Sequence, residues 1–261
     1  MATSPNADAA LPTFGFVTLH RQPLADGVAR EADWLAASAA LGQASAHLWT
    51  APAGIVVPRR YTWLPGWAAA AADRQHGEVR VRASGGGLVP QGPGVWNLSL
   101  AWPAPAAAPT DTDAIYRALC ATLAAALARL GVAASPQPVA GSFCDGRFNL
   151  AVQGRKLVGT AQAWRRVAGV PMVLAHAVIV VSADPQALTT RANAFEQALG
   201  TATRYRAEAL TSVADCITPA GQAAAAPADI DARVLAALAE QFARVALPRV
   251  HHTQEIEHGA A

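Results

Sequence analysis

Two residues in the middle of the chain could do chemistry together: a cysteine, Cys144, and the chain's single lysine, Lys156. Every other residue in the Lys+Arg total is an arginine. A thiolate is a strong nucleophile, and an ammonium can stabilise an oxygen atom on which negative charge develops. Lysine offers a compact point charge, whereas the guanidinium of arginine is a planar fork that a narrow pocket can exclude. The pair therefore indicates chemistry at a carbonyl or phosphate oxygen.

Cys144 follows Gly-Ser-Phe and precedes Asp-Gly-Arg, so we expect it in a polar, exposed loop. Arg147, Arg155 and Lys156 come soon after it, and nearby cations favour the thiolate form of a cysteine. A lone cysteine can equally be a small, unreactive apolar side chain. On these residues alone, both interpretations of Cys144 stay open.

The other two cysteines are expected to be structural: Cys120 lies within an Ala/Leu-rich helix, and Cys216, after Ser-Val-Ala-Asp, has no context that favours a reactive thiol. Three cysteines without metal-ligand spacing predict neither a zinc site nor a disulfide framework, which favours a reducing cytoplasm. With no basic run and a net charge of +2, nucleic acid is not the expected partner. No apolar run is long enough to cross a bilayer, so no membrane is expected either.

Lys156 is expected on the return strand of a hairpin whose turn is Gln153–Gly154. The alternation of a strand predicts one face with Lys156, Val158, Thr160 and Gln162, and another with Leu157, Gly159 and Ala161. A face with Lys, Thr and Gln opposite a face of small residues suits a binding groove. An ordinary solvated charge at a sheet edge is the alternative.

A glycine-rich bend, "RASGGGLVPQGPG" at residues 82–94, is the second unusual segment. Each glycine in a strand costs roughly 0.5–1 kcal/mol relative to alanine, so a run of them marks a sharp turn or a close approach to a ligand. Arg82 and Ser84 add a cation and a hydroxyl there. The bend lacks the spacing of dinucleotide-binding and Walker motifs. It predicts a groove for an acyl chain or a nucleotide, with a bulged hairpin as the alternative.

The elements that must position these residues follow from periodicity. Helices are predicted at residues 25–43 and 113–131, two short strands at 46–61, a strand interrupted by the bend at 77–102, the hairpin at 148–164, and a buried strand at 170–184. Two or three helices follow. Hairpins with interspersed helices predict an α+β domain with a mixed, mostly antiparallel sheet flanked by helices. We expect one domain at residues 13–250, with disordered tails at 1–12 and 251–261.

Three segments carry a family resemblance: "RASGGGLVPQGPGVWNLSL", "GRFNLAVQGRKLVGTAQAWRR" and "VLAHAVIVVSAD". They resemble the lipoate–protein ligase A and octanoyltransferase family, which shares its catalytic domain with biotin protein ligases. The resemblance implies a mixed sheet with a tunnel for a medium-chain acyl group. It also implies transfer of an octanoyl or lipoyl group to a lysine of a lipoyl domain, as found in the glycine cleavage H protein and 2-oxoacid dehydrogenase subunits.

The resemblance also implies site residues. Lys156 would contact the acyl carbonyl or an adenylate phosphate, and the substrate-binding residues would be Arg82, Ser84, Gly85, Gly86, Gly87, Asn149, Gly159, Thr160 and Gln162. No metal-ligating residue is implied. The chain departs from the family pattern at Val81, at Gln91–Gly92 and at Asn149, where the family has an arginine, His–Asp and an aspartate.

Within the family, the loop with Cys144 resembles the cysteine-dependent branch that moves octanoyl from the glycine cleavage H protein to other proteins. Such a transferase needs no cofactor. The alternative is a lipoate–protein ligase that lacks its accessory domain and uses ATP and Mg. A non-catalytic acyl-binding or carrier-binding homologue is the third possibility. No histidine is clearly placed as a base for Cys144, and His176, on an apolar strand, is expected to be a core histidine.

Overall fold

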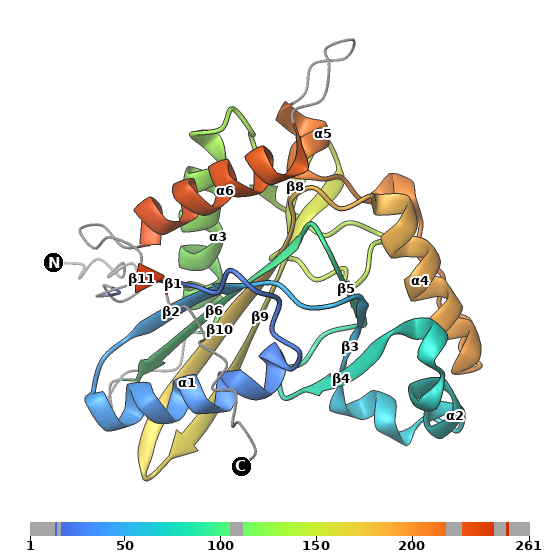
Figure 1. Ribbon diagram of the computed structural model, residues 1–261, viewed down its shortest axis with the longest axis horizontal. Helices are drawn as coiled ribbons and strands as arrows, with labels where there is room; N and C mark the ends of the chain where they lie inside the picture. The colour runs from blue at the N-terminus through green and yellow to red at the C-terminus, as the bar shows by residue number, and fades with distance from the viewer. Residues whose placement is uncertain (1–13, 15–16, 105–111, 218–225, 243–248, 251–261) are drawn as a thin grey trace, which may run out of the picture.

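The structure, a computed structural model, describes residues 14, 17–104, 112–217, 226–242 and 249–250. The predicted tails at 1–12 and 251–261 lie outside these residues. The described residues form two β-sheets with helices around them (Figure 1). Within the described ranges, no helix has both the length and the apolar character needed to cross a membrane.

The larger sheet has eight strands in the order β11-β1-β2-β6-β10-β9-β8-β7. Its strands are β1 (Val17–Leu19), β2 (Ser45–Trp49), β6 (Val95–Pro103), β7 (Ser135–Pro136), β8 (Leu150–Val152), β9 (Arg155–Val167), β10 (Val170–Val180) and β11 (Arg249–Val250). β1 runs parallel to β2 and β11, and the other pairs are antiparallel. The predicted mixed, mostly antiparallel sheet is confirmed.

A smaller sheet has three strands in the order β4-β3-β5: β3 (Gly54–Pro58), β4 (Glu78–Arg82) and β5 (Val89–Gln91). The two strands predicted at 46–61 therefore form, but β2 and β3 belong to different sheets. The helices are α1 (Gly27–Leu41), α2 (Trp67–Ala72), α3 (Thr112–Ala128), α4 (Pro185–Ala198), α5 (Val213–Ile217) and α6 (Pro227–Phe242). Short 3-10 helices lie at η1 (Arg59–Trp63), η2 (Arg74–His76) and η3 (Ala207–Ala209).

Helices α3 and α6 pack together on one face of the larger sheet, and α1 crosses β6 and β10 on the other face (Figure 1). The apolar repeat of α3 explains its side of this packing, since Leu119, Leu123 and Leu127 are buried in the main core. The smaller sheet and α4 share a second core around Ile55 and Phe195. The larger sheet is thus covered on both faces.

Local signals set the ends of the elements that carry the site. Asp26 caps α1, because its carboxylate accepts a hydrogen bond from the backbone nitrogen of Ala29 at 2.9 Å, and Gly42 ends the helix in the left-handed conformation. The hairpin of β8 and β9 turns at Gln153 and Gly154, both with positive φ, which matches a tight two-residue turn. This turn fixes where Lys156 enters the sheet.

Candidate active site

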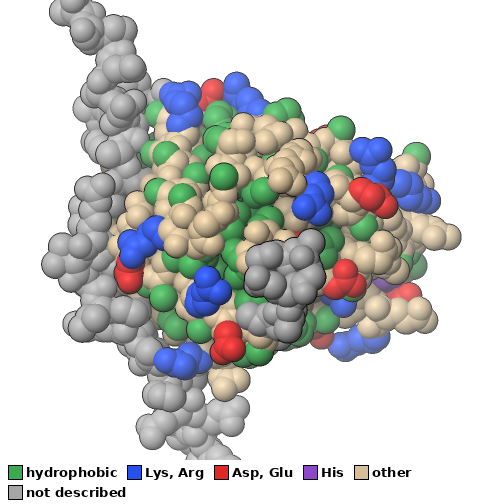
Figure 2. Space-filling model, turned by 90° about the horizontal axis from the view of Figure 1, so that it is seen from above, with side chains coloured by type: hydrophobic (Ala, Val, Ile, Leu, Met, Phe, Trp, Pro, Cys, Tyr) green, Lys and Arg blue, Asp and Glu red, His purple; other side chains and the backbone are tan. Residues whose placement is uncertain are grey.

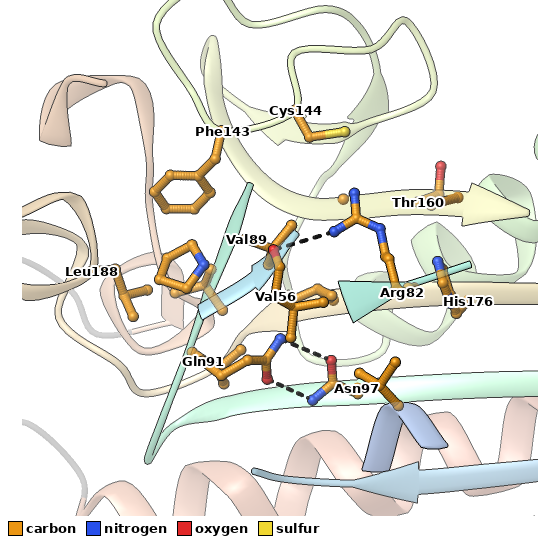
Figure 3. Close-up of a pocket in the computed structure, with 18 of the residues that line it drawn as sticks. Val56, Arg82, Val89, Gln91, Asn97, Phe143, Cys144, Thr160, His176 and Leu188 are labelled. Carbon is orange, nitrogen blue, oxygen red and sulfur yellow. Dashed lines mark hydrogen bonds between the residues drawn. The ribbon is translucent and has the colours of Figure 1, made fainter. Parts of the chain in front are cut away.

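A cavity lies on the face of the larger sheet that α1 covers. The smaller sheet, α4 and the loop that contains Cys144 enclose it from the other sides (Figure 3). Its apolar lining includes Val28, Val56, Val89, Pro90, Val95, Phe143, Leu157, Val178, Val180, Leu188 and Leu210. Cys144 and Phe143 lie at one end in Figure 3, and Gln91 and Asn97 at the other. An apolar cavity with a few convergent polar groups suits an elongated, mostly apolar ligand.

The glycine-rich bend is held by Arg82, the last residue of β4. Its guanidinium donates hydrogen bonds to the carbonyl oxygens of Gly85 at 2.9 Å and Gly87 at 2.6 Å, and it reaches that of Val56 at 3.4 Å. The side chain is buried, and burial lowers the pKa of Arg82. In an extended strand these two carbonyl oxygens would lie too far apart to bind the same guanidinium nitrogen. The bend therefore creates this binding site for Arg82, and Arg82 in turn stabilises the bend.

Cys144 lies directly against this bend. A Cβ atom added at Gly86 would come within 2.7 Å of the Cys144 Sγ and 2.9 Å of an Arg82 guanidinium nitrogen. A Cβ at Gly87 would lie 3.2 Å from the Cys144 backbone nitrogen. Gly86 also has φ of 102°, a conformation that other residues rarely adopt. These two glycines therefore allow the thiol to approach the backbone of the bend.

Lys156 is the second buried cation beside Cys144. Its Nζ donates hydrogen bonds to the carbonyl oxygens of Phe143 and Cys144, the latter at 2.8 Å. Burial lowers the pKa of Lys156 to about 8, and a negative charge on Cys144 or Asp145 opposes that shift. A Cβ at Gly159 would lie 3.1 Å from Nζ, so a small residue is needed there.

Among the described residues, neither Arg82 nor Lys156 forms an ion pair with a carboxylate; both bind backbone carbonyl oxygens. A buried charge without a counter-ion is costly, and a bound or transient anion reduces that cost. The sulfur of Cys144, as a thiolate, is an anion in the right place. So is the oxyanion that forms when a carbonyl beside that sulfur is attacked.

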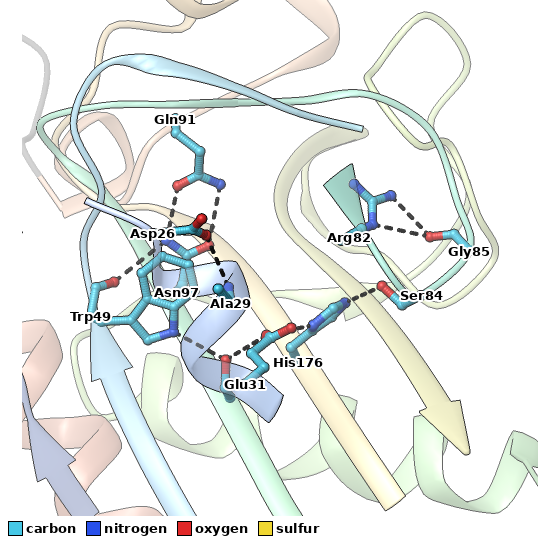
Figure 4. Close-up of polar contacts among 11 residues, drawn as sticks. Asp26, Ala29, Glu31, Trp49, Arg82, Ser84, Gly85, Gln91, Asn97 and His176 are labelled. Carbon is cyan, nitrogen blue, oxygen red and sulfur yellow. Dashed lines mark hydrogen bonds and ion pairs between the residues drawn. The ribbon is translucent and has the colours of Figure 1, made fainter. Parts of the chain in front are cut away.

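A hydrogen-bonded row of polar side chains lines the sheet side of the cavity (Figure 4). Glu31 of α1 lies 3.0 Å from His176 Nδ1, and His176 Nε2 lies 2.9 Å from the hydroxyl of Ser84. Ser99 donates to Glu31 at 2.8 Å and accepts from the Trp49 indole at 3.0 Å. The row ties the start of the bend to the larger sheet through α1. His176 is therefore hydrogen-bonded as expected, but it lines the cavity instead of lying within the core.

A second polar pair closes the other end of the cavity. The amides of Gln91 and Asn97 exchange two hydrogen bonds, at 2.9 and 3.2 Å, and both side chains are buried (Figures 3 and 4). Gln91 stands where the family resemblance expects a histidine. The two side chains that close this end of the cavity are therefore uncharged and satisfy each other's hydrogen bonds.

The face assignment on β9 needs a correction. Gly159 and Ala161 pair with Val178 and His176 of β10 and line the cavity with them, so the small-residue face is the cavity face. A register irregularity between Leu150 and Ala151 interrupts the simple alternation expected from the sequence.

The structure brings most predicted site residues together around the cavity, but three of them do not present a group to it. Thr160 borders the cavity, but its hydroxyl donates to the Phe148 carbonyl at 2.7 Å. The amide of Gln162 donates to the Thr112 carbonyl on α3, which places it away from the cavity. Gly85 is exposed, and an added Cβ would contact nothing within 4 Å.

The cations expected around Cys144 are also partly different. The Arg147 side chain is exposed and pairs with Asp113 at 2.6 Å. Lys156 reaches the Cys144 backbone as expected, and Arg82, from a distant segment, is the second cation. Burial raises the pKa of the Cys120 thiol to about 11 and also raises that of Cys216, which agrees with a structural role for both.

Cys144 is half-buried and borders a second, outer hollow as well as the inner cavity. That hollow is lined by Arg60, Tyr61, Gly86, Gly87, Gly141, Ser142, Asp145, Gly146, Thr203, Arg204 and Tyr205. The thiol is thus accessible from the surface through the outer hollow, separately from the inner cavity. On the face shown in Figure 2, the described basic and acidic side chains are interspersed and form no continuous basic stripe.

Sequence reasoning missed Glu31, Ser99, Gln91 and Asn97 as site residues. Asn97 and Ser99 alternate with large apolar residues in β6, a pattern that equally fits a face open to solvent. Glu31 lies next to the charged residue Arg30 and close to Asp33, both of which are exposed and pair with each other. Within the described part of the chain, no group of three or more His, Cys, Asp or Glu side chains is placed to hold a metal ion.

A family model described as the lipoyl protein ligase A/B catalytic domain matches residues 29–243. The chain belongs to this family. A protein of Cupriavidus necator without an assigned function is 43% identical over 220 residues, which cover 79% of this chain and 85% of that protein. Members of this family are lipoyl and octanoyl protein ligases and transferases, and the protein is an enzyme of this group.

Two relatives carry the name octanoyl-[GcvH]:protein N-octanoyltransferase. The one from Kyrpidia tusciae is 42% identical over 142 residues, or 52% of this chain and 48% of that protein. The one from Geobacillus kaustophilus is 40% identical over 100 residues, or 37% of this chain and 33% of that protein. Each of these two matches covers less than half of the relative's own length.

Solved structures share the fold. A lipoate-protein ligase A bound with ATP has a TM-score of 0.64 at 17% identity, covering 92% of this chain and 90% of that one. A bi-partite lipoate protein ligase from Thermoplasma acidophilum has a TM-score of 0.59 at 16% identity, covering 93% and 89%. The expected family and fold are confirmed.

Proposed function

We propose that this family member transfers an octanoyl or lipoyl group to a lysine of a lipoyl domain through a thioester on Cys144. The proposal depends on the position of the Cys144 sulfur, which lies against Gly86 and the guanidinium of Arg82, while the buried ammonium of Lys156 binds the backbone carbonyl of the same cysteine and interacts electrostatically with its thiolate. The two relatives named as octanoyl transferases support the same class of reaction. No cofactor is needed for this chemistry.

The reaction has two halves. In the first, the Cys144 thiolate attacks the acyl carbonyl of a donor, the carbon–sulfur bond forms, and the bond to the donor's nitrogen or sulfur breaks as that atom takes up a proton. In the second, the neutral amine of the acceptor lysine attacks the thioester, an amide forms, Cys144 leaves as thiolate, and the amine's proton passes to solvent. Lys156 and Arg82 stabilise the negative charge in both halves.

The cavity and the outer hollow suit these two halves. The apolar lining around Val178 and Leu188 would hold the hydrocarbon chain, with its carbonyl near Cys144. The donor and the acceptor are proteins, so they must reach the thiol from the surface, where the outer hollow lies. Gly86 and Gly87 would lie beside the reacting carbonyl, Gly159 would leave room for the Lys156 ammonium, and Ser84 would hold the start of the bend through His176.

An ATP-dependent lipoate–protein ligase is the second candidate, favoured by the ATP-bound structure that shares the fold. Two buried cations without carboxylate partners could equally hold the phosphate of an acyl adenylate. Such an enzyme would need ATP and Mg with free acid, and Cys144 would be dispensable. A non-catalytic binding protein is the third candidate, and it would show no turnover.

Intact mass spectrometry distinguishes the three. The full chain is incubated with an octanoylated lipoyl domain, without ATP, as wild type and as Cys144→Ser. We expect one octanoyl adduct on the wild type, removed by hydroxylamine, and none on the variant. Cys216→Ser is the matched control and keeps the adduct, because burial raises the pKa of that thiol and it lies outside the cavity.

Transfer that requires ATP and free octanoate, and that persists in Cys144→Ser, would establish the ligase instead. Binding of the acylated domain without adduct or product, with or without ATP, would establish a carrier-binding protein.

A further inference from the structure

The backbone of Cys144 is in a conformation that cysteine rarely adopts. Its φ is 55°, in the left-handed region that favours glycine, and only two other described non-glycine residues, Gln153 and Ala168, have positive φ. Those two lie in tight hairpin turns, which explains them. Cys144 lies in a longer loop, so other contacts must hold it.

Two side chains hold the carbonyl of Cys144. The amide nitrogen of Asn149 donates a hydrogen bond to this oxygen at 2.8 Å, and the ammonium of Lys156 donates to the same oxygen at 2.8 Å. Asn149 is 1% exposed, which fixes its amide in place. With the carbonyl held between two donors, the Cys144 side chain extends toward Gly86.

An aspartate, which the family pattern has at this position, could not make this contact. A carboxylate has no N–H to donate, and its oxygen would face the Cys144 carbonyl oxygen. It would also attract the Lys156 ammonium, which donates to that same carbonyl. The asparagine therefore leaves Lys156 without a fixed counter-ion and available to the sulfur or to an oxyanion.

We propose that Asn149 is a positioning residue that holds the Cys144 backbone so that the thiol faces Arg82 and Lys156, and that it does not contact the acyl group. The proposal rests on the function proposed above. The groups that interact electrostatically with the thiol or lie next to it are Lys156, Arg82, Tyr116 and Asp145. The other charged and titratable groups that line the same two cavities are Glu31, Arg60, Tyr61, His176, Arg204 and Tyr205.

The test uses the full chain as wild type, Asn149→Asp and Asn149→Ala. The rate of Cys144 alkylation by iodoacetamide is measured across pH by peptide mass spectrometry, and octanoyl loading from an octanoylated lipoyl domain is measured in parallel. We expect Asn149→Asp to raise the pH midpoint of alkylation by about one to two units, since a carboxylate now opposes the thiolate. We expect Asn149→Ala to lower the loading rate about tenfold with a smaller shift of the midpoint.

The matched control is Asn193→Asp. Asn193 also donates its amide to a backbone carbonyl, that of Tyr205 at 2.9 Å, and it accepts from the Tyr205 nitrogen. The Asn193→Asp substitution should lower the stability of the protein without changing the pH midpoint of Cys144 alkylation.

A midpoint and a loading rate unchanged in both Asn149 variants would overturn the positioning role even if wild-type Cys144 carries the acyl group. If Asn149→Asp does not fold, Asn149→Ala decides through its loading rate. If wild type carries no adduct, the transfer function fails, and the alkylation midpoints still decide whether Asn149 positions the thiol.

Discussion

The two faces of strand β6 show how differently one sheet can be used. Trp96, Leu98 and Leu100 point into the core with α3 and α6. Asn97 and Ser99, the residues between them, point to the opposite face, where they join the polar groups of the cavity. Both faces are buried, yet one is apolar and the other is a hydrogen-bonded network.

The difference lies in what covers each face. Helices α3 and α6 present mainly leucines and other apolar side chains, so the first face gains stability from apolar burial. The second face is covered by α1 and the smaller sheet, which bring Glu31 and Arg82 into the interior. Each buried polar group there needs a partner, and buried cations without carboxylates reduce stability. Substitutions on the first face should therefore mainly lower the free energy of unfolding. Substitutions of the buried cations on the second face should mainly lower activity.

The sharpest test is Lys156→Met. Removing a charged donor at the site of a developing oxyanion should lower acyl transfer about 100–1000-fold. The melting temperature should rise or stay the same, because a buried charge without a counter-ion is replaced by an apolar side chain. Both are measured on the same preparation, by transfer to a lipoyl domain and by thermal unfolding.

Arg155→Met is the control, because it removes a cation from the adjacent position, outside the residues that line the cavity. It should keep transfer. Normal transfer by Lys156→Met, or a large loss of its stability, would place Lys156 among structural residues.

A pair of substitutions on neighbouring residues of β6 tests the comparison directly. Leu98→Ala should lower the free energy of unfolding by about 3 kcal/mol, since Leu98 is fully buried in the main core. Ser99→Ala should lower it by about 1–2 kcal/mol, because Glu31 and Trp49 each lose a hydrogen bond. Urea denaturation measures both. A larger loss for Ser99→Ala than for Leu98→Ala would reverse the assignment of the two faces.

The pH dependence of stability tests the buried charge of Lys156 directly. Burial lowers the pKa of Lys156 to about 8 from 10.5, so the unfolded chain binds more protons than the folded protein between these values. Lys156 therefore lowers the stability of the folded protein by its full amount below pH 8, and this destabilisation diminishes as pH rises toward 10.5. Transfer should fall over the same range as the ammonium is lost.

The measurement is urea denaturation of wild type and Lys156→Met between pH 7 and 10.5, with transfer rates alongside. The difference in stability between the two proteins should narrow as pH rises. A constant difference would mean that Lys156 keeps its proton throughout the range.

Local patterns predicted the elements and one half of the site. The turn at Gln153–Gly154 and the leucine repeat of α3 depend on neighbours in the chain, so the sequence was sufficient for them. The closeness of Cys144 and Lys156 follows from the same hairpin.

The other half of the site is made of contacts between distant segments. Glu31 meets His176 across 145 positions, and Ser84 meets it across 92. Alternation indicates which strand residues share a face, but it does not indicate what covers that face. The irregularity next to Leu150 breaks the alternation between Lys156 and Val158, and Lys156 lines the cavity together with Gly159 and Ala161.

The burial of the only lysine has a consequence for the chemistry of the protein itself. An enzyme that carries an activated acyl group on a thiol could lose it to any ε-amine of its own within reach. Here that amine is a single group, enclosed in the interior and engaged with the carbonyls of Phe143 and Cys144. Arginine supplies the rest of the positive charge without an ε-amine, so the thioester proposed for Cys144 would meet no lysine of this chain other than Lys156.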